Sequence, residues 1–158
     1  MACRSTPTVP TVAAINGHCF AAAAMLALAC DYRVMIDGAK RNTWMCMNEV
    51  DFGAAWPVSF AAVVRAKVSV VREFAIEGHR FTPPEARDAG LVDEIVSGGT
   101  RGVLKRALEI AEEKAPKARE GVWGVIKVRL SLHFSDDYMQ ILTRSLMSCA
   151  GRTVSPSN

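Results

Sequence analysis

Two short stretches of the chain carry residue types that suit proton transfer at carbon. Asn16-Gly17-His18 runs into the apolar stretch Ala21 to Met25, so a turn leads directly into a helix start. After a short basic loop, an isolated carboxylate follows at Glu49. The N–H groups at a helix start can hold an anion, and a carboxylate in apolar company can act as a base. These residues therefore predict a site that moves a proton on carbon.

The composition is that of one globular domain. The chain has 158 residues, of which 50% are apolar and 22% are charged, and its net charge is +3. Lys and Arg alternate with Asp and Glu without forming a block, so we expect no nucleic-acid partner. The longest apolar run, Cys19 to Cys30, is shorter than the roughly 20 residues that cross a bilayer. We expect this run to form a buried helix, and we expect no membrane span.

The cysteines and histidines show no metal-ligand pattern. The five cysteines include no Cys-x-x-Cys pair, and four of them sit among apolar neighbours. None of His18, His79 and His133 is spaced with a Cys or a carboxylate as a ligand pair. We therefore expect core thiols in a reducing compartment and no metal site.

The elements that must position the two stretches are predicted from hydrophobic spacing and from turn residues. Strands are expected in the first part of the chain, followed mainly by helices. On the helix 103–114, the predicted buried face consists of Leu104, Ala107, Leu108 and Ala111. We expect a core at 1–100, a helical region at 101–150 and a disordered tail at 151–158. The expected strands are 8–15, 32–36, 43–47 and 91–96, and the expected helices are 21–30, 57–67, 70–77, 83–89, 103–114, 123–132 and 138–149.

Three segments in a fixed order carry a family resemblance: Pro10 to Met35, Met47 to Gly53 and Phe81 to Val96. They resemble the enoyl-CoA hydratase/isomerase (crotonase) family. Asn-Gly-His-Cys-Phe-Ala and Asn-Glu-Val-Asp-Phe-Gly are most similar to its eukaryotic Δ3,Δ2-enoyl-CoA isomerase branch. The resemblance implies an α/β fold, a ClpP/crotonase-like spiral of β-β-α units with a C-terminal helical region, and a homotrimer. Met1 to Pro10 contains no Ala-x-x-x-Gly-x-Asp loop, so we expect an N-terminally truncated form of this fold.

The resemblance also assigns the central site residues. It implies an acyl-CoA thioester substrate whose carbonyl oxygen is held by backbone N–H groups, one of them from Ala22. Ala21 and Ala23 occupy the flanking positions of the family's Gly-Gly-Gly stretch. A backbone donor does not require Gly, and alanine can sit at a helix start, so we expect the hole to survive this substitution. Of the two acid positions of hydratases, the first falls on Met25 and the second on Glu49.

Further residues are expected to touch the substrate, each with a simpler alternative. His18, Phe20, Met25 and Phe52, with Ala21 and Ala23, are the predicted substrate-binding residues. A structural hydrogen bond is the alternative for His18, and core packing is the alternative for Phe20 and Met25. Core packing is equally the alternative for the possible pocket residues Trp44, Met45 and Met47. Asp51 is expected to cap its own loop, and Arg65, Lys67 and Arg72 are either exposed helix charges or contacts to the phosphates of coenzyme A.

These residues favour isomerisation over hydration. Addition of water needs two carboxylates, whereas moving a double bond needs one base that takes a proton from one carbon and returns it two carbons further on. We therefore expect a Δ3,Δ2-enoyl-CoA isomerase of fatty acid β-oxidation with Glu49 as the base. Coenzyme A is part of the substrate, and no cofactor is expected. The alternatives are a non-catalytic crotonase-like subunit or fragment and, less favoured, a hydratase.

The expected compartment comes from the resemblance alone. Family members of this branch imply a peroxisome or a mitochondrion. The chain ends in Pro156-Ser157-Asn158 and not in a Ser-Lys-Leu-type peroxisomal address. No targeting signal is recognised in the chain.

Overall fold

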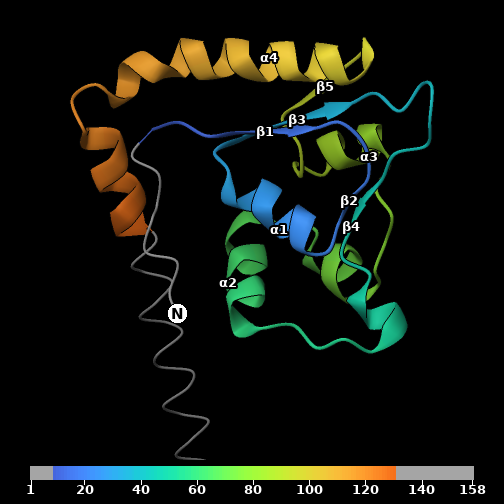
Figure 1. The fold of residues 1–158 in the computed structure, drawn as a ribbon. Coiled ribbons are helices and arrows are strands. Elements are labelled where there is room, and N and C mark those ends of the chain that lie inside the picture. The colour runs from blue at the N-terminus through green and yellow to red at the C-terminus, as the bar shows by residue number, and fades with distance from the viewer. Residues whose placement is uncertain (1–8, 131–158) are drawn as a thin grey trace, which may run out of the picture.

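The computed structural model describes residues 9–130 and contains two small parallel sheets (Figure 1). The first sheet has the order β1-β3-β5, formed by Val12–Ile15, Tyr32–Ile36 and Glu94–Val96. The second sheet pairs β2 (Cys19–Phe20) with β4 (Met45–Cys46). The four ranges expected as strands each contain one of β1, β3, β4 and β5, and only β3 has the expected length. The mixed α/β class is therefore confirmed.

The helices follow the expected order along the chain. The capping box at Thr82 and Glu85 confirms the predicted start of α3, since the Glu85 carboxylate accepts hydrogen bonds from the N–H and hydroxyl of Thr82, both at 2.8 Å. Residues 122–130 are also helical. The predicted helix 138–149 and the predicted tail lie outside the described residues. The elements are α1 (Ala22–Ala29), the 3₁₀ turn η1 (Glu49–Phe52), α2 (Val58–Lys67), the π-helical turn η2 (Arg72–Ile76), α3 (Pro83–Asp88), α4 (Gly99–Lys114) and the 3₁₀ turn η3 (Ala115–Ala118).

The three-stranded sheet is covered by helices on both faces. Side chains alternate along β3, so Val34 packs against α4 while Met35 belongs to the larger core on the opposite side. Figure 1 shows α4 running across one side of this sheet, with α1 and α2 on the other. Arg106 of α4 is tied to Glu94 of β5 by two short hydrogen bonds of 2.6 and 2.8 Å. This paired contact fixes α4 to the edge of the sheet.

The larger core surrounds the Ala-rich helix α1. Four α1 residues at i, i+1, i+3 and i+4 spacing are buried: Ala24, Met25, Ala27 and Leu28. Small alanines let neighbouring elements approach closely, and α1 contacts α2, β1 and β2. Helix α1 is therefore held by packing from several directions.

Two predictions about local structure are wrong. Cys19 to Cys30 is not one buried helix, because Cys19–Phe20 forms β2 and Leu26 is 72% exposed. The buried face of α4 consists of Val103, Ala107 and Ile110, which are rotated by about one residue from the predicted face. Leu104 and Leu108 are more than half exposed. Sequence spacing alone allowed either face, and contact with the sheet selects the one that includes β-branched Val103 and Ile110.

Candidate active site

The two stretches with candidate chemistry meet at one edge of the small sheet. β2 and β4 are parallel, so their carboxyl ends lie at the same edge. The N–H of Ala21, directly after β2, donates a hydrogen bond to the carbonyl oxygen of Cys46 at 3.0 Å. Helix α1 begins at the next residue, Ala22, and Glu49 follows Cys46 by three residues. The helix start and the carboxylate therefore leave adjacent strand ends.

Ala21 has an unusual backbone conformation. Its φ is 52° and its ψ is −125°, and it is the one non-glycine residue with positive φ in residues 9–130. This combination is strained for a residue that carries a Cβ. Ala21 precedes the helix, so the argument that alanine suits a helix start applies to Ala22 and Ala23 but not to Ala21. The carbonyl oxygen of Ala21 accepts the N–H of Met25 at 3.1 Å, so the strained residue closes the first turn of α1.

The first turn of α1 offers backbone donors. The N–H groups of Ala22, Ala23 and Ala24 have no acceptor inside the helix, because they belong to its first turn. Ala22 and Ala23 are exposed, whereas Ala24 is fully buried. The amide dipoles of a helix add a partial positive charge at this end. A ligand oxygen that carries developing negative charge would therefore be stabilised beside Ala22.

Glu49 is a buried carboxylate at the start of η1. Its exposed fraction is 8%, and its Oε2 atom has no hydrogen-bond partner within the part of the chain that the structure describes. The surrounding turn is held by its backbone: the Ala54 N–H and the Gly53 N–H both donate to the Glu49 carbonyl oxygen. Gly53 ends the turn with φ of 72°, which glycine adopts without strain. A buried carboxylate oxygen that lacks a protein donor is suited to meet a substrate hydrogen.

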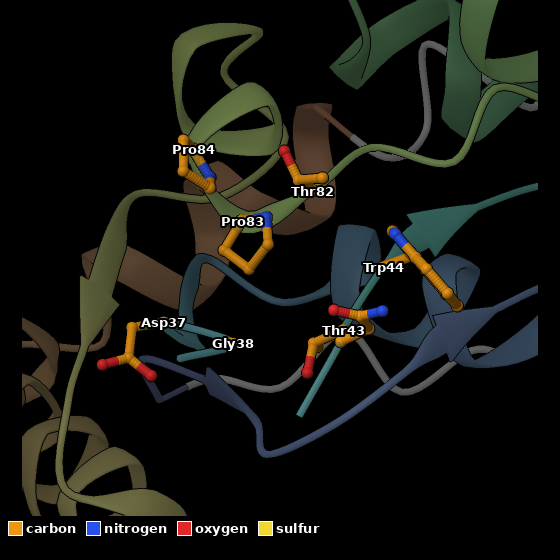
Figure 2. A pocket seen from close by; sticks show the side chains of 8 residues that line it. Asp37, Gly38, Thr43, Trp44, Thr82, Pro83 and Pro84 are labelled. Atoms are coloured by element: carbon orange, nitrogen blue, oxygen red, sulfur yellow. The ribbon is translucent and has the colours of Figure 1, made fainter. Parts of the chain in front are cut away.

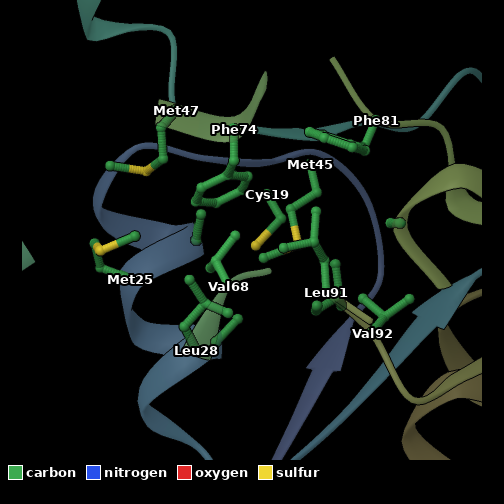
Figure 3. Close-up of a cluster of buried hydrophobic side chains, with 14 of the residues drawn as sticks. Cys19, Met25, Leu28, Met45, Met47, Val68, Phe74, Phe81, Leu91 and Val92 are labelled. Carbon is green, nitrogen blue, oxygen red and sulfur yellow. The ribbon is translucent and has the colours of Figure 1, made fainter. Parts of the chain in front are cut away.

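Sulfur-bearing side chains line the neighbouring core. Met25 of α1 and Met47, just before Glu49, lie on the same side of this core (Figure 3). Burial raises the pKa of the Cys46 thiol; Arg80 opposes that shift, and the carboxylates of Glu49 and Asp51 add to it. Burial likewise raises the pKa of Cys19 to about 11. Burial therefore disfavours the thiolate, the nucleophilic form, at both cysteines.

The sequence of this chain matches the family model described as enoyl-CoA hydratase/isomerase over residues 4–142. The chain belongs to this family. It is 36% identical over 116 residues to enoyl-CoA delta isomerase 2, peroxisomal, of Arabidopsis thaliana. This alignment covers 72% of the chain and 47% of the relative. It is 35% identical over 126 residues to enoyl-CoA delta isomerase 3 of the same plant. This alignment covers 77% of the chain and 52% of the relative.

A solved structure confirms the fold class. An enoyl-CoA hydratase/isomerase family protein from Pseudomonas syringae superposes with a TM-score of 0.72 at 25% identity, covering 82% of this chain and 54% of that protein. The chain spans about half the length of the curated relatives named above. The architecture is thus that of a crotonase fold matched over part of its length, as the sequence resemblance predicts.

The predicted substrate-binding residues of this crotonase-fold chain do not all lie together. His18 lies beside Phe20, whereas Phe52 lies apart from them. His18 stacks on Trp44 with ring centroids 5.0 Å apart and lies 5.1 Å from the ring of Phe20. The Trp44 N–H donates to Nδ1 of His18 at 3.3 Å, so His18 makes the structural hydrogen bond that the sequence left as its alternative. His18 and Ala23 also line a hollow of about 260 Å³ between β1 and α1.

Phe52 lies apart from this group. It is 64% exposed, and its neighbour Val50 is 53% exposed, so the apolar side chains next to Glu49 in sequence do not enclose it. A second hollow of about 310 Å³ lies between the β3–β4 loop and the start of α3 (Figure 2). Trp44 contributes to its wall, but none of the predicted substrate-binding residues does.

Sequence reasoning missed Gly78. Gly78 is buried, has φ of 59° and lies against Asn48 and Val50 of the Glu49 turn. The signal available in the sequence was the Gly78-His79 pair between two helical patterns, which indicates a turn but not its partner. Only the tertiary structure places this turn beside Glu49.

Two further observations concern the described residues alone. No helix within residues 9–130 is long and apolar enough to cross a membrane. In the same range, no three side chains of the His, Cys, Asp or Glu type gather in a way that could hold a metal ion.

Proposed function

We propose that this protein is a Δ3,Δ2-enoyl-CoA isomerase, which moves the double bond of a 3-enoyl-CoA to the 2-position. The observation that carries the proposal is the buried Glu49 carboxylate, whose Oε2 has no hydrogen-bond partner among residues 9–130. It lies beside the strand end that is hydrogen-bonded to Ala21, the residue before α1. The names of the Arabidopsis relatives, which are enoyl-CoA delta isomerases, support this choice of reaction.

The proposed reaction uses one base and one group of donors. Ionised Glu49 removes a proton from C2 of the substrate, between the thioester carbonyl and the C3–C4 double bond. The electron pair of the broken C–H bond moves into a dienolate, and the negative charge on its oxygen is stabilised by the Ala22 N–H at the start of α1. Glu49 then delivers the proton to C4, which leaves the double bond between C2 and C3 and regenerates the carboxylate.

The side chain at position 25 supports isomerisation over hydration. A hydratase needs a second acid–base group to position and deprotonate water. Met25 stands at the position that the resemblance assigns to this first acid, and it is 6% exposed within the apolar core. A thioether carries no transferable proton, so the proposal gives Met25 the role of an apolar wall beside the acyl chain.

The partners and the compartment of the proposal follow from the same resemblance. The substrate is an acyl-CoA thioester, no cofactor is needed because no electrons are transferred to an external acceptor, and the assembly is a homotrimer. The cellular role is fatty acid β-oxidation in a peroxisome or mitochondrion. One of the two Arabidopsis relatives is named as peroxisomal, which supports the first compartment.

A non-catalytic crotonase-like subunit is the second candidate. The observation that favours it is the exposure of Val50 and Phe52, which do not enclose Glu49 as an acyl-binding wall would. In that case the chain would bind acyl-CoA weakly or associate with longer relatives without turning substrate over.

Product analysis separates these functions. The full chain is incubated with 3-hexenoyl-CoA and, separately, with 2-hexenoyl-CoA. The isomerase proposal expects the absorbance of a conjugated thioester to appear from the first substrate and no mass gain from the second. A product heavier by one water would support a hydratase instead. No conversion of either compound would support the non-catalytic subunit.

A further inference from the structure

Gly78 packs against the turn that carries Glu49. A Cβ built on Gly78 would lie 3.2 Å from Cγ1 of Val50 and 3.5 Å from Cα of Asn48. Gly78 is buried and has φ of 59°, a left-handed conformation that favours glycine. The absence of a side chain at this position thus allows two backbone segments to approach each other closely, and one of them leads directly into Glu49.

The contact continues a strand pairing that begins at β4. Met45 and Phe81 form an antiparallel bridge, with N–H to carbonyl distances of 2.9 and 3.0 Å in the two directions. Three residues further along the first segment is Asn48, and three residues back along the second is Gly78. A Cβ on Gly78 would lie 3.5 Å from Asn48 Cα, and this close approach of the two segments matches the antiparallel register. The segment 78–81 therefore supports the chain from the end of β4 up to the candidate base.

Support of this turn matters for Glu49, because one oxygen of its carboxylate is not held by a hydrogen bond within the described residues. Its Oε2 atom has no hydrogen-bond partner within residues 9–130, so no described side chain or amide orients that oxygen. The backbone of η1 therefore contributes to the direction of the side chain. We infer that Gly78 is a positioning residue that holds the Glu49 turn in place for proton transfer, an inference that rests on the proposed isomerase function.

The chain offers a matched control at Gly90. Its φ of 71° resembles that of Gly78, but a Cβ at Gly90 would have no atom within 4 Å. Gly90→Ala therefore carries the same type of backbone strain without the contact. Gly78→Ala adds the contact with Val50, and the double variant Gly78→Ala with Val50→Ala removes it again. Val50 is 53% exposed, so Val50→Ala leaves the core intact.

The first measurement is amide hydrogen exchange of the full chain at Asp51, Gly53 and Ala54, whose N–H groups bond within the Glu49 turn. Gly78→Ala is expected to accelerate exchange at these three amides by about tenfold, with little change in Gly90→Ala. The double variant is expected to return towards the wild-type rates. Equal exchange in Gly78→Ala and Gly90→Ala would overturn the inference.

The second measurement is turnover of 3-hexenoyl-CoA. Gly78→Ala is expected to lower kcat by about tenfold or more with a small change in KM, because a base displaced by tenths of an ångström transfers protons less efficiently. Gly90→Ala should keep the wild-type kcat. A higher KM with an unchanged kcat would contradict a positioning role. If Gly78→Ala and the double variant both fail to fold while Gly90→Ala folds, Gly78 supports the whole fold and the inference is wrong.

The two measurements separate the inference from the function on which it rests. Wild-type protein that does not convert 3-hexenoyl-CoA contradicts the isomerase proposal. The exchange rates still decide whether Gly78 holds the Glu49 turn, because they require no substrate.

Discussion

The N–H of Ala21 donates a hydrogen bond to the carbonyl oxygen of Cys46 at 3.0 Å. This bond joins the residue before α1 to the last residue of β4, and thereby connects the helix start to the turn of Glu49. Because the two segments are tied through backbone atoms, the relative position of the candidate donors and the candidate base does not depend on any one side chain.

Ala21→Gly is expected to stabilise the protein. Ala21 has φ of 52° and ψ of −125°, so its Cβ is strained in a conformation that glycine adopts freely. The free energy gained by relieving this strain exceeds the entropic cost of the more flexible unfolded chain. We therefore expect the free energy of unfolding to rise by about 1 kcal/mol. The measurement is the midpoint of urea unfolding.

Ala23→Gly serves as the opposite case. Ala23 lies inside α1 and is exposed, and glycine there lowers the free energy of unfolding by about 0.5–1 kcal/mol relative to alanine. A decrease in stability for both variants would show that Ala21 is not strained in solution.

Lys127→Met is expected to destabilise the protein by about 2 kcal/mol. The Lys127 ammonium donates to Asp31 at 2.8 Å, and the two side chains are only 15% and 17% exposed. Asp31 also accepts bonds from the N–H and hydroxyl of Thr11, so its largely buried charge would lose one of three donors. Calorimetric or urea unfolding measures the change.

Lys105→Met is the control for this substitution. Its ammonium lies 3.9 Å from Glu109 on the exposed face of α4, and its side chain is 80% exposed. We expect a change within about 0.5 kcal/mol. Equal effects of the two Lys→Met variants would mean that the Asp31 contact contributes nothing specific.

Glu85→Gln is expected to weaken the acid dependence of stability. Hydrogen bonds from the Thr82 N–H, and then from its hydroxyl, lower the pKa of Glu85 below its ordinary 4.5. A carboxylate whose folded pKa is lowered stabilises the protein above the unfolded pKa, and this contribution is lost as the pH falls through the folded pKa. The free energy of unfolding should therefore fall less steeply below pH 4.5 in Glu85→Gln than in the wild type.

Thr82→Ser tests the cause of that effect. Serine keeps the hydroxyl and the N–H, so the wild-type acid dependence should remain. A steep fall in Glu85→Gln, equal to that of the wild type, would show that other carboxylates account for the whole dependence.

Local sequence patterns predicted where helices and strands lie better than they predicted which residues contact one another or are buried. The capping box at Thr82 and the boundaries of β3 follow from neighbouring residues, and the structure agrees with both. The conformation of Ala21 was not predictable, because it arises from the bond to Cys46, which is 25 residues away in the sequence. The contact of Gly78 with Asn48 is equally non-local. Sequence spacing also could not choose the buried face of α4, which the sheet selects.

The part of the candidate site that could be predicted is the residue whose type suits proton transfer. Glu49 was identified from its apolar neighbours and from the family resemblance, and the structure places it in the interior. Its catalytic role stays a prediction, as does that of Ala22. Phe52 was expected to bind the substrate, yet it lies in the 3₁₀ turn and is 64% exposed.

The most direct test of the central claim compares Glu49→Gln with Asp51→Asn. Both changes replace a carboxylate by an amide in the same turn, but Glu49 is buried and Asp51 is exposed. Turnover of 3-hexenoyl-CoA is measured together with binding of a saturated acyl-CoA. The one-base account predicts that Glu49→Gln lowers kcat by about 10³-fold with nearly unchanged binding, whereas Asp51→Asn retains wild-type turnover. Wild-type turnover by Glu49→Gln would contradict the account.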